Sequence, residues 1–263
     1  MPVMLRVLAL GDVMGRPGRH LVSAALKGIV KEHDIDLVIA NGENASGGAG
    51  LSVKNAGELF DAGVDVITSG NHIWHQKEYE DVFDQYARVI RPANYPEPCP
   101  GNGYVILKKS GARVAVVNLQ GRTYMEPIES PFAVFDGLRE EIGKEASVII
   151  IDLHAEVTSE KVAMGWYVDG RASFMFGTHT HVPTADARVL PGGTAYITDL
   201  GMCGAYESVI GMERDAIIRK FTTLRPQRFD VAKGDVRLNG AICQIDPASG
   251  KAASIERFEH RPA

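Results

Sequence analysis

The residues best suited to chemistry in this sequence are polar side chains that directly follow short apolar runs. His179 and His181 end the stretch FMFGTHTH, where the two imidazoles are two residues apart. Residues i and i+2 of a strand share a face, and in a loop their side chains converge easily, so this spacing suits a shared ligand. The other members of the series, in chain order, are Asp12, Glu43, Asn44, Asn71, His72 and His154.

This set of side chains has the mixed oxygen and nitrogen character that suits manganese, iron or zinc. It contains no thiolate, because the three cysteines, Cys99, Cys203 and Cys243, are widely spaced and form no CxxC pair, which disfavours a structural zinc site. The candidate ligands also outnumber the three protein ligands of a typical open catalytic site. Two ions about 3.5–4 Å apart, bridged by the carboxylate of Glu43, are therefore the simplest interpretation.

Each of these residues also has a purely structural interpretation. Asp12 suits an Asx turn or a helix cap, Asn44 and Asn71 suit turns, and a lone His154 suits a hydrogen-bonded core position. Their recurrence at one edge of a predicted sheet favours a shared site over so many separate explanations.

The segments that must position these residues follow an α/β pattern. LRVLAL and DLVIA are short apolar runs, each followed by a turn and a helical pattern, and VDVITSGNH fits the same scheme. YVILKKSGARVAVVNLQG predicts a hairpin around Ser110 and Gly111, so we expect mixed sheets. The C-terminal third is richer in alternating strand patterns. In open α/β sheets, ligands bind at the carboxyl ends of the strands, which is where the polar residues are expected.

Length and composition limit the possibilities further. A chain of 263 residues suits one large domain, which we expect to span 1–263. With 45% hydrophobic residues and a formal net charge of -5, it has no basic excess for stable binding to duplex nucleic acid. The first apolar run is short and has no basic leader, so we expect a cytoplasmic protein without membrane association and with reduced thiols. A small homo-oligomer, dimer or tetramer, is compatible with the sequence.

Three further residues have two interpretations each. Arg16 and Arg19 in GRPGR suit either contacts to phosphate or the solvated start of a helix. Asp199 suits either the orientation of a ligand histidine or a turn.

The ordered motifs resemble those of the calcineurin-like metallophosphoesterases. They are GD at 11–12, GEN at 42–44, GNH at 70–72, the lone His154 after an apolar run, and GTHTH at 177–181. The stretches GDVMGRPGR, NGENASGG, SGNHIW and GTHTHVPTAD resemble the YmdB-like bacterial phosphodiesterase branch over nearly the whole chain. The sequence departs from the broader superfamily at Met14, where the usual D-x-H motif has its histidine, and at 42–44, where GEN replaces the usual GD motif.

The resemblance implies a metallophosphoesterase-type αββα sandwich with mixed sheets and a dinuclear metal centre. One ion would be held by Asp12, Glu43, Asn44 and His181, and the other by Glu43, Asn71, His154 and His179. Asn44 would replace the ligand lost at Met14. The ions expected are iron or manganese, with zinc as an alternative.

Paired cations neutralise a phosphate ester, position it and acidify a bridging water into hydroxide, so the residues predict phosphate ester hydrolysis. His72 is predicted to protonate the leaving oxygen as general acid, and its alternative is a structural position. The resemblance implies 2′,3′- and 3′,5′-cyclic nucleotides as substrates. Two other functions stay open: a phosphomonoesterase acting on nucleotide or sugar phosphates, and a regulatory protein that binds metal and nucleotide with negligible turnover.

Overall fold

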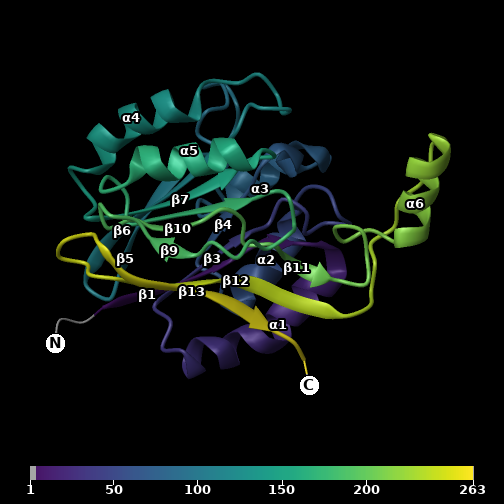
Figure 1. Ribbon diagram of the computed structural model, residues 1–263, viewed down its shortest axis with the longest axis horizontal. Coiled ribbons are helices and arrows are strands. Elements are labelled where there is room, and N and C mark those ends of the chain that lie inside the picture. Colours follow the sequence, from purple (N-terminus) through teal and green to yellow (C-terminus); the bar gives the residue numbers. More distant parts are fainter. Residues whose placement is uncertain (1–3, 263) are drawn as a thin grey trace.

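Two β-sheets lie face to face, and helices cover the outer face of each in the computed structural model, which describes residues 4–262 (Figure 1). One sheet has seven strands in the order β2-β11-β12-β1-β3-β4, with β13 paired to β12, and the other has six in the order β5-β6-β7-β8-β10-β9. Both sheets contain parallel and antiparallel pairs. The predicted αββα sandwich with mixed sheets is confirmed.

The seven-stranded sheet combines strands from both ends of the chain. It contains β1 (Leu5–Leu10), β2 (Asp12–Val13), β3 (Leu37–Asn41), β4 (Val66–Thr68), β11 (Met202–Ala205), β12 (Val236–Ile245) and β13 (Ala252–His260). Its outer face packs against α1 (Gly15–Glu32), α2 (Val53–Ala62) and α3 (Tyr79–Gln85) through one hydrophobic cluster that includes Leu8, Val22 and Leu59.

The six-stranded sheet comes mainly from the middle of the chain. It contains β5 (Tyr104–Lys109), β6 (Ala112–Gln120), β7 (Val148–His154), β8 (Phe174–Thr178), β9 (Arg188–Val189) and β10 (Ala195–Ile197). The predicted hairpin is present, because β5 and β6 pair antiparallel around Ser110 and Gly111, which both have positive φ. Helices α4 (Pro131–Ile142) and α5 (Thr158–Val168) cover the outer face.

The core between the sheets explains the continuous apolar runs of the sequence. In β1, Leu8 and Leu10 face the helices, whereas Val7 and Ala9 face the second sheet, so both faces of the strand are buried. Such strands need apolar residues at every position. Polar residues gather near the carboxyl ends of these strands, and the ends of β3 and β4 meet those of β7 and β8 at one edge: Asn41 Nδ2 donates to Asp152 Oδ2 across the sheets over 3.1 Å.

One segment departs from the strand-rich pattern expected of the C-terminal third. Between β11 and β12 the chain forms α6 (Arg214–Thr223), which projects away from the sandwich (Figure 1). No helix among residues 4–262 has the length and apolar character needed to cross a membrane.

The contact between α1 and β11 depends on the absence of a side chain at Gly18. A Cβ at Gly18 would lie 2.1 Å from the carbonyl oxygen of Cys203, whereas a Cβ at Gly28 in the same helix would meet nothing within 4 Å. We predict that Gly18→Ala lowers the free energy of unfolding by about 1–3 kcal/mol through overpacking. Gly28→Ala should raise it by up to about 1 kcal/mol through helix propensity. Urea unfolding of both variants measures the difference, and an unchanged Gly18→Ala would contradict this packing.

Candidate metal centre

The polar residues singled out in the sequence lie together at the edge of the sandwich where the strands end. Asp12 begins β2, and Glu43 and Asn44 follow β3 in a turn. Asn71 and His72 begin the short 3-10 helix η1 (Asn71–His75), which follows β4. His154 is the last residue of β7, and His179 and His181 follow β8. The structure thus brings all the candidate ligands to one place, while their role as ligands stays a prediction.

Four of these residues form what we call the His154 cluster: Glu43, Asn71, His154 and His179. Ligand atoms of Glu43, His154 and His179 lie within 4.8 Å of one another. His154 Nε2 is 3.2 Å from Glu43 Oε1, 3.1 Å from Asn71 Oδ1 and 3.0 Å from His179 Nδ1. The members are the same as those that the resemblance implies for one ion.

Hydrogen bonds on the side of His154 and His179 that points away from the cluster determine which ring nitrogen carries the proton. Thr178 Oγ1 donates to Asp152 Oδ1 over 2.7 Å, so it accepts the Nδ1–H of His154 at 3.0 Å. His179 Nε2 lies 3.0 Å from the carboxylate of Glu156 and donates to it. The two remaining ring nitrogens, 3.0 Å apart, are therefore the atoms directed into the centre, where each can offer a lone pair to a cation beside two acceptor oxygens. A group of acceptors of this kind fits a cation.

The pKa values of these groups reflect burial and the close approach of carboxylates and imidazoles. Burial lowers the pKa of His154, but the carboxylates of Glu43, Asp12 and Asp152 outweigh burial and raise it to about 9. Burial raises the pKa of Glu43, yet His154 and His72 bring it down to about 2. Burial and then the neighbouring His154 lower the pKa of His179 to about 3. The centre thus attracts one positive charge strongly, which a metal cation would supply.

A second group, the Asp12 cluster, consists of Asp12, Asn44 and His181 and adjoins Glu43. Asp12 Oδ1 is buried without a hydrogen-bond partner among residues 4–262 and lies 3.7 Å from His181 Nε2. His181 donates its Nδ1–H to the carbonyl of Ile210 at 2.8 Å, so its Nε2 presents a lone pair, which faces the Asn44 amide. A buried carboxylate oxygen without a partner is costly, and a cation between these atoms would remove that cost.

The Asn44 amide is oriented differently from what a ligand needs. Its Nδ2 lies 3.1 Å from His181 Nε2, and its Oδ1 lies 2.7 Å from His72 Nδ1. Rotation of the amide by half a turn would exchange these atoms and direct the oxygen to the Asp12 cluster. Met14, where the superfamily usually has a histidine, is buried against Gly204 and Gly211 instead.

His72 lines the cavity into which the centre opens. Its main-chain N–H donates to Glu43 Oε2 over 2.9 Å, and its half-buried ring stacks on exposed His75 with centroids 4.9 Å apart. Burial lowers the pKa of His72, although Glu43 acts in the opposite direction. Nδ1 faces Asn44, so Nε2 is the ring atom left for a substrate.

Several supporting residues were missed in the sequence. Asp152, Thr178 and Glu156 orient the imidazoles, and the one charged residue inside VIIIDLH was the available signal for Asp152. Asp199 contacts no candidate ligand through its hydrogen bonds. Its Oδ2 accepts Lys161 Nζ at 2.6 Å and Thr180 Oγ1 at 2.7 Å, so it positions the loop between the two histidines.

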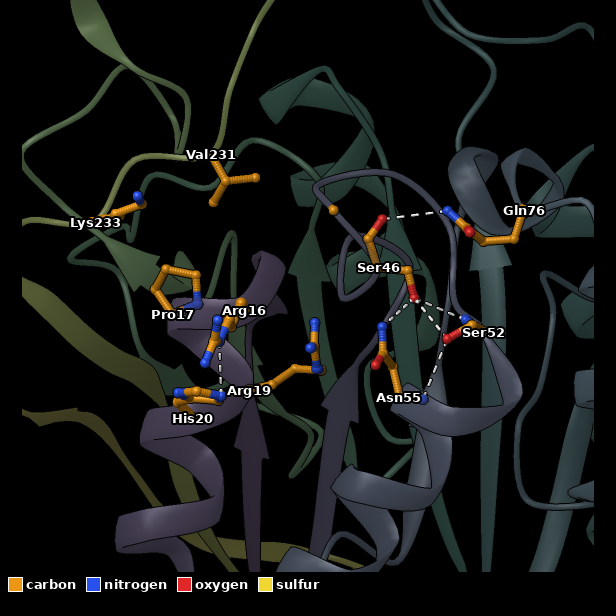
Figure 2. A pocket seen from close by; sticks show the side chains of 11 residues that line it. Arg16, Pro17, Arg19, His20, Ser46, Ser52, Asn55, Gln76, Val231 and Lys233 are labelled. Atoms are coloured by element: carbon orange, nitrogen blue, oxygen red, sulfur yellow. Dashed lines mark hydrogen bonds between the residues drawn. The ribbon is translucent and has the colours of Figure 1, made fainter.

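The two arginines of GRPGR line a separate cavity of about 760 Å³, together with Ser46, Asn55 and Lys233 (Figure 2). Arg19 is buried and bonds to Glu58 and to the carbonyl of Ala45, so it joins α1 to α2 and to the turn after β3. None of the candidate ligands lines this cavity. The centre itself opens into a cavity of about 320 Å³ lined by residues that include Glu43, His72, Glu156 and His181.

The αββα sandwich, with carboxylate, amide and imidazole side chains gathered at its strand ends, is that of the metallophosphoesterase class. Within it, the family model described as "YmdB-like protein" matches residues 8–258, and the chain belongs to that family.

Relatives agree with this assignment. The chain is 49% identical to a 2′,3′-cyclic-nucleotide 2′-phosphodiesterase of Bacillus subtilis, over 97% of this chain and 96% of that protein. It is 38% identical to a putative phosphatase/phosphodiesterase of Mycoplasma genitalium, over 97% and 92%. The crystal structure of a phosphatase from Mycoplasma pneumoniae superposes with a TM-score of 0.93 at 36% identity, over 99% of this chain and 95% of that one. The predicted family and the predicted enzyme class, a phosphoric ester hydrolase, are confirmed.

The acceptor-rich centre predicts cation binding that is measurable without any substrate. We expect chelator-treated protein to bind Mn²⁺ and to gain about 2.7 kcal/mol of stability at a concentration 100 times the dissociation constant. Glu43→Gln should weaken binding by more than the roughly 10–100-fold typical of an outer contact. Isothermal titration and thermal unfolding report both quantities. His260→Ala, in β13, is the control, and equal binding by Glu43→Gln would refute the site.

Proposed function

We propose that this protein is a dinuclear metal-dependent phosphodiesterase that hydrolyses cyclic nucleotides, in both 2′,3′ and 3′,5′ forms. The observation that carries the proposal is the position of the Glu43 carboxylate between the two clusters. Its Oε1 lies 3.2 Å from His154 Nε2 in one cluster and 3.2 Å from Asn44 Nδ2 in the other. A carboxylate in that position suits a bridge between two ions.

In the proposed arrangement, the chain offers two ligand sets that share Glu43. One is Asp12, Glu43, Asn44 and His181, and the other is Glu43, Asn71, His154 and His179. Oxygen and nitrogen donors without sulfur suit iron or manganese, with zinc as an alternative. When bound, such a pair of ions neutralises the phosphate oxygens and activates a water for attack on phosphorus.

The protein's contribution is to hold the ligand atoms in place. Glu156 accepts from His179, the carbonyl of Ile210 accepts from His181, and Thr178 accepts from His154, so each ring presents one defined lone pair. Outer partners of this kind orient metal-bound imidazoles and raise their basicity.

His72 is the proposed proton donor to the leaving oxygen. In the rotated orientation, Asn44 would offer Oδ1 as a ligand and donate Nδ2–H to His72 Nδ1, 2.7 Å from the present oxygen position. His72 would then carry its proton on Nε2, the ring nitrogen that Asn44 does not contact. A single amide rotation thus serves both the ligand set and the acid.

The support for a diester substrate is the Bacillus subtilis relative, whose name specifies a cyclic nucleotide and whose alignment covers nearly the whole of both chains. The Mycoplasma relatives, named phosphatase/phosphodiesterase and phosphatase, favour a second candidate, a phosphomonoesterase with the same centre.

The first experiment measures hydrolysis of 2′,3′-cyclic AMP by metal-stripped protein before and after addition of Mn²⁺. We expect turnover only with Mn²⁺ and its loss in Asn71→Ala, because Asn71 Oδ1 belongs to the His154 cluster. Hydrolysis of 3′,5′-cyclic AMP and of nucleoside monophosphates separates the diesterase from the monoesterase. No turnover of any of these with Mn²⁺ bound would favour a regulatory metal and nucleotide binder.

The role of His72 is testable through the leaving group. We predict that His72→Ala lowers kcat for 2′,3′-cyclic AMP by about 10²–10⁴, the usual contribution of a general acid. An ester with a 4-nitrophenolate leaving group, which departs without a proton, should lose much less. His75→Ala, which removes only the exposed neighbouring ring, is the control. Equal losses for both esters would exclude the acid role.

A further inference from the structure

Helix α6 has little contact with its own chain. Of its ten residues, Arg214 to Thr223, only Ile217 is buried, and Figure 1 shows the helix projecting from the side of the sandwich. An isolated helix of this length is marginal in water, because most helical stability in proteins comes from packing of an apolar face.

The exposed side of α6 is nevertheless apolar along one row. Ile218, Phe221 and Leu224 follow one another at intervals of three and are 53%, 76% and 88% exposed. Residues three apart lie side by side on a helix. A contiguous row of large apolar side chains on the surface marks a contact with another molecule.

An apolar groove of about 370 Å³ lies at the root of the same segment. The groove is lined mainly by Val182, Pro183, Met202, Val209 and Ile210, and His181 also lines it. Val182 and Ile210 are 57% and 51% exposed. Main-chain hydrogen bonds from Tyr206 N to Asp235 O and from Glu213 N to Asp230 O pair the segment that leads into α6 with the segment that follows it. These bonds hold the base of α6 in place.

We propose that α6 of one copy of this chain docks in the groove of a second copy, and that the exchange is mutual. Groove and helix belong to the same segment, with three residues between Ile210 and Arg214, so in a two-fold pair the docking of one helix brings the other helix to the first groove. Mutual exchange of this kind closes a two-fold dimer and leaves no free copy of either surface.

The charge of the segment around α6 also favours a second copy of this chain as the partner. The arm from 213 to 233 carries six Lys or Arg and three Asp or Glu, whereas the chain as a whole has a formal net charge of -5. The basic arm is therefore attracted to the acidic remainder of a second copy.

The dimer would also complete the wall of the candidate site. His181 and Ile210 line both the groove and the cavity of the metal centre. The docked helix of the partner would therefore lie beside the ligand histidine and restrict access from that side.

The test measures molecular mass in solution by light scattering, with no substrate present, so its outcome is independent of the proposed activity. We expect a dimer at micromolar concentration for the unmodified protein and a monomer for the double variant Phe221→Glu, Leu224→Glu. Thr222→Glu, exposed on the same helix, should stay dimeric. A monomeric unmodified protein, or a double variant of unchanged mass, would overturn the proposal.

Cross-linking tests the position of the helix in the dimer. With Cys99 replaced by Ser, the pair Val182→Cys and Leu224→Cys should form a disulfide between two chains on mild oxidation. The pair Val182→Cys and Thr222→Cys is the matched control and should link far less. A disulfide within one chain would show that α6 folds back on its own groove, and this result would overturn the proposal.

Discussion

The buried carboxylate of Asp152 joins the two sheets beside the candidate metal centre, and the arrangement of this centre depends on it. From the seven-stranded sheet it accepts Thr68 Oγ1 at 2.5 Å and Asn41 Nδ2 at 3.1 Å, and from its own sheet it accepts Thr178 Oγ1 at 2.7 Å. Thr178 in turn fixes the proton of His154. Burial raises the pKa of Asp152 to about 6, because its three donors only partly replace water. One side chain thus fixes the spacing of the sheets and the direction of a candidate ligand.

Charge in this part of the molecule is balanced in two different ways. Asp199 is neutralised by the buried amine of Lys161 at 2.6 Å, a pair that belongs entirely to the chain. Glu43 and Asp12 have no Lys or Arg partner among the described residues and face imidazoles and an amide instead. Buried carboxylates without a resident cation are costly. A metal cation bound among these acceptors would offset that cost, as the proposed function requires.

The sequence predicted much of this arrangement because these strands are mostly apolar on both faces and polar residues lie at or just after their carboxyl ends. That pattern identified β1, β3, β7 and β8 and the residues that follow them, and the Ser110–Gly111 turn identified the hairpin of β5 and β6. The outer partners were not identified, since Asp152 and Glu156 are ordinary acidic residues until the fold places them beside an imidazole. Helix α6 was missed for another reason. Most of its apolar side chains are exposed, so among the described residues little core packing accompanies the helix.

The sequence by itself determined the class of fold, the enzyme family and the identity of the candidate ligands, because local apolar periodicity and motif order are properties of the chain alone. Only the tertiary structure decided which nitrogen of each histidine is directed into the candidate centre and that the amide nitrogen of Asn44 faces His181. It also decided that Arg19 bonds within the fold, between α1 and α2, and that Asp199 positions the loop between the two histidines. These depend on atoms from strands and helices far apart in the chain, and their distances are set by packing of the two sheets. The orientation of a donor or acceptor is therefore a property of the folded core, whereas its presence is a property of the sequence.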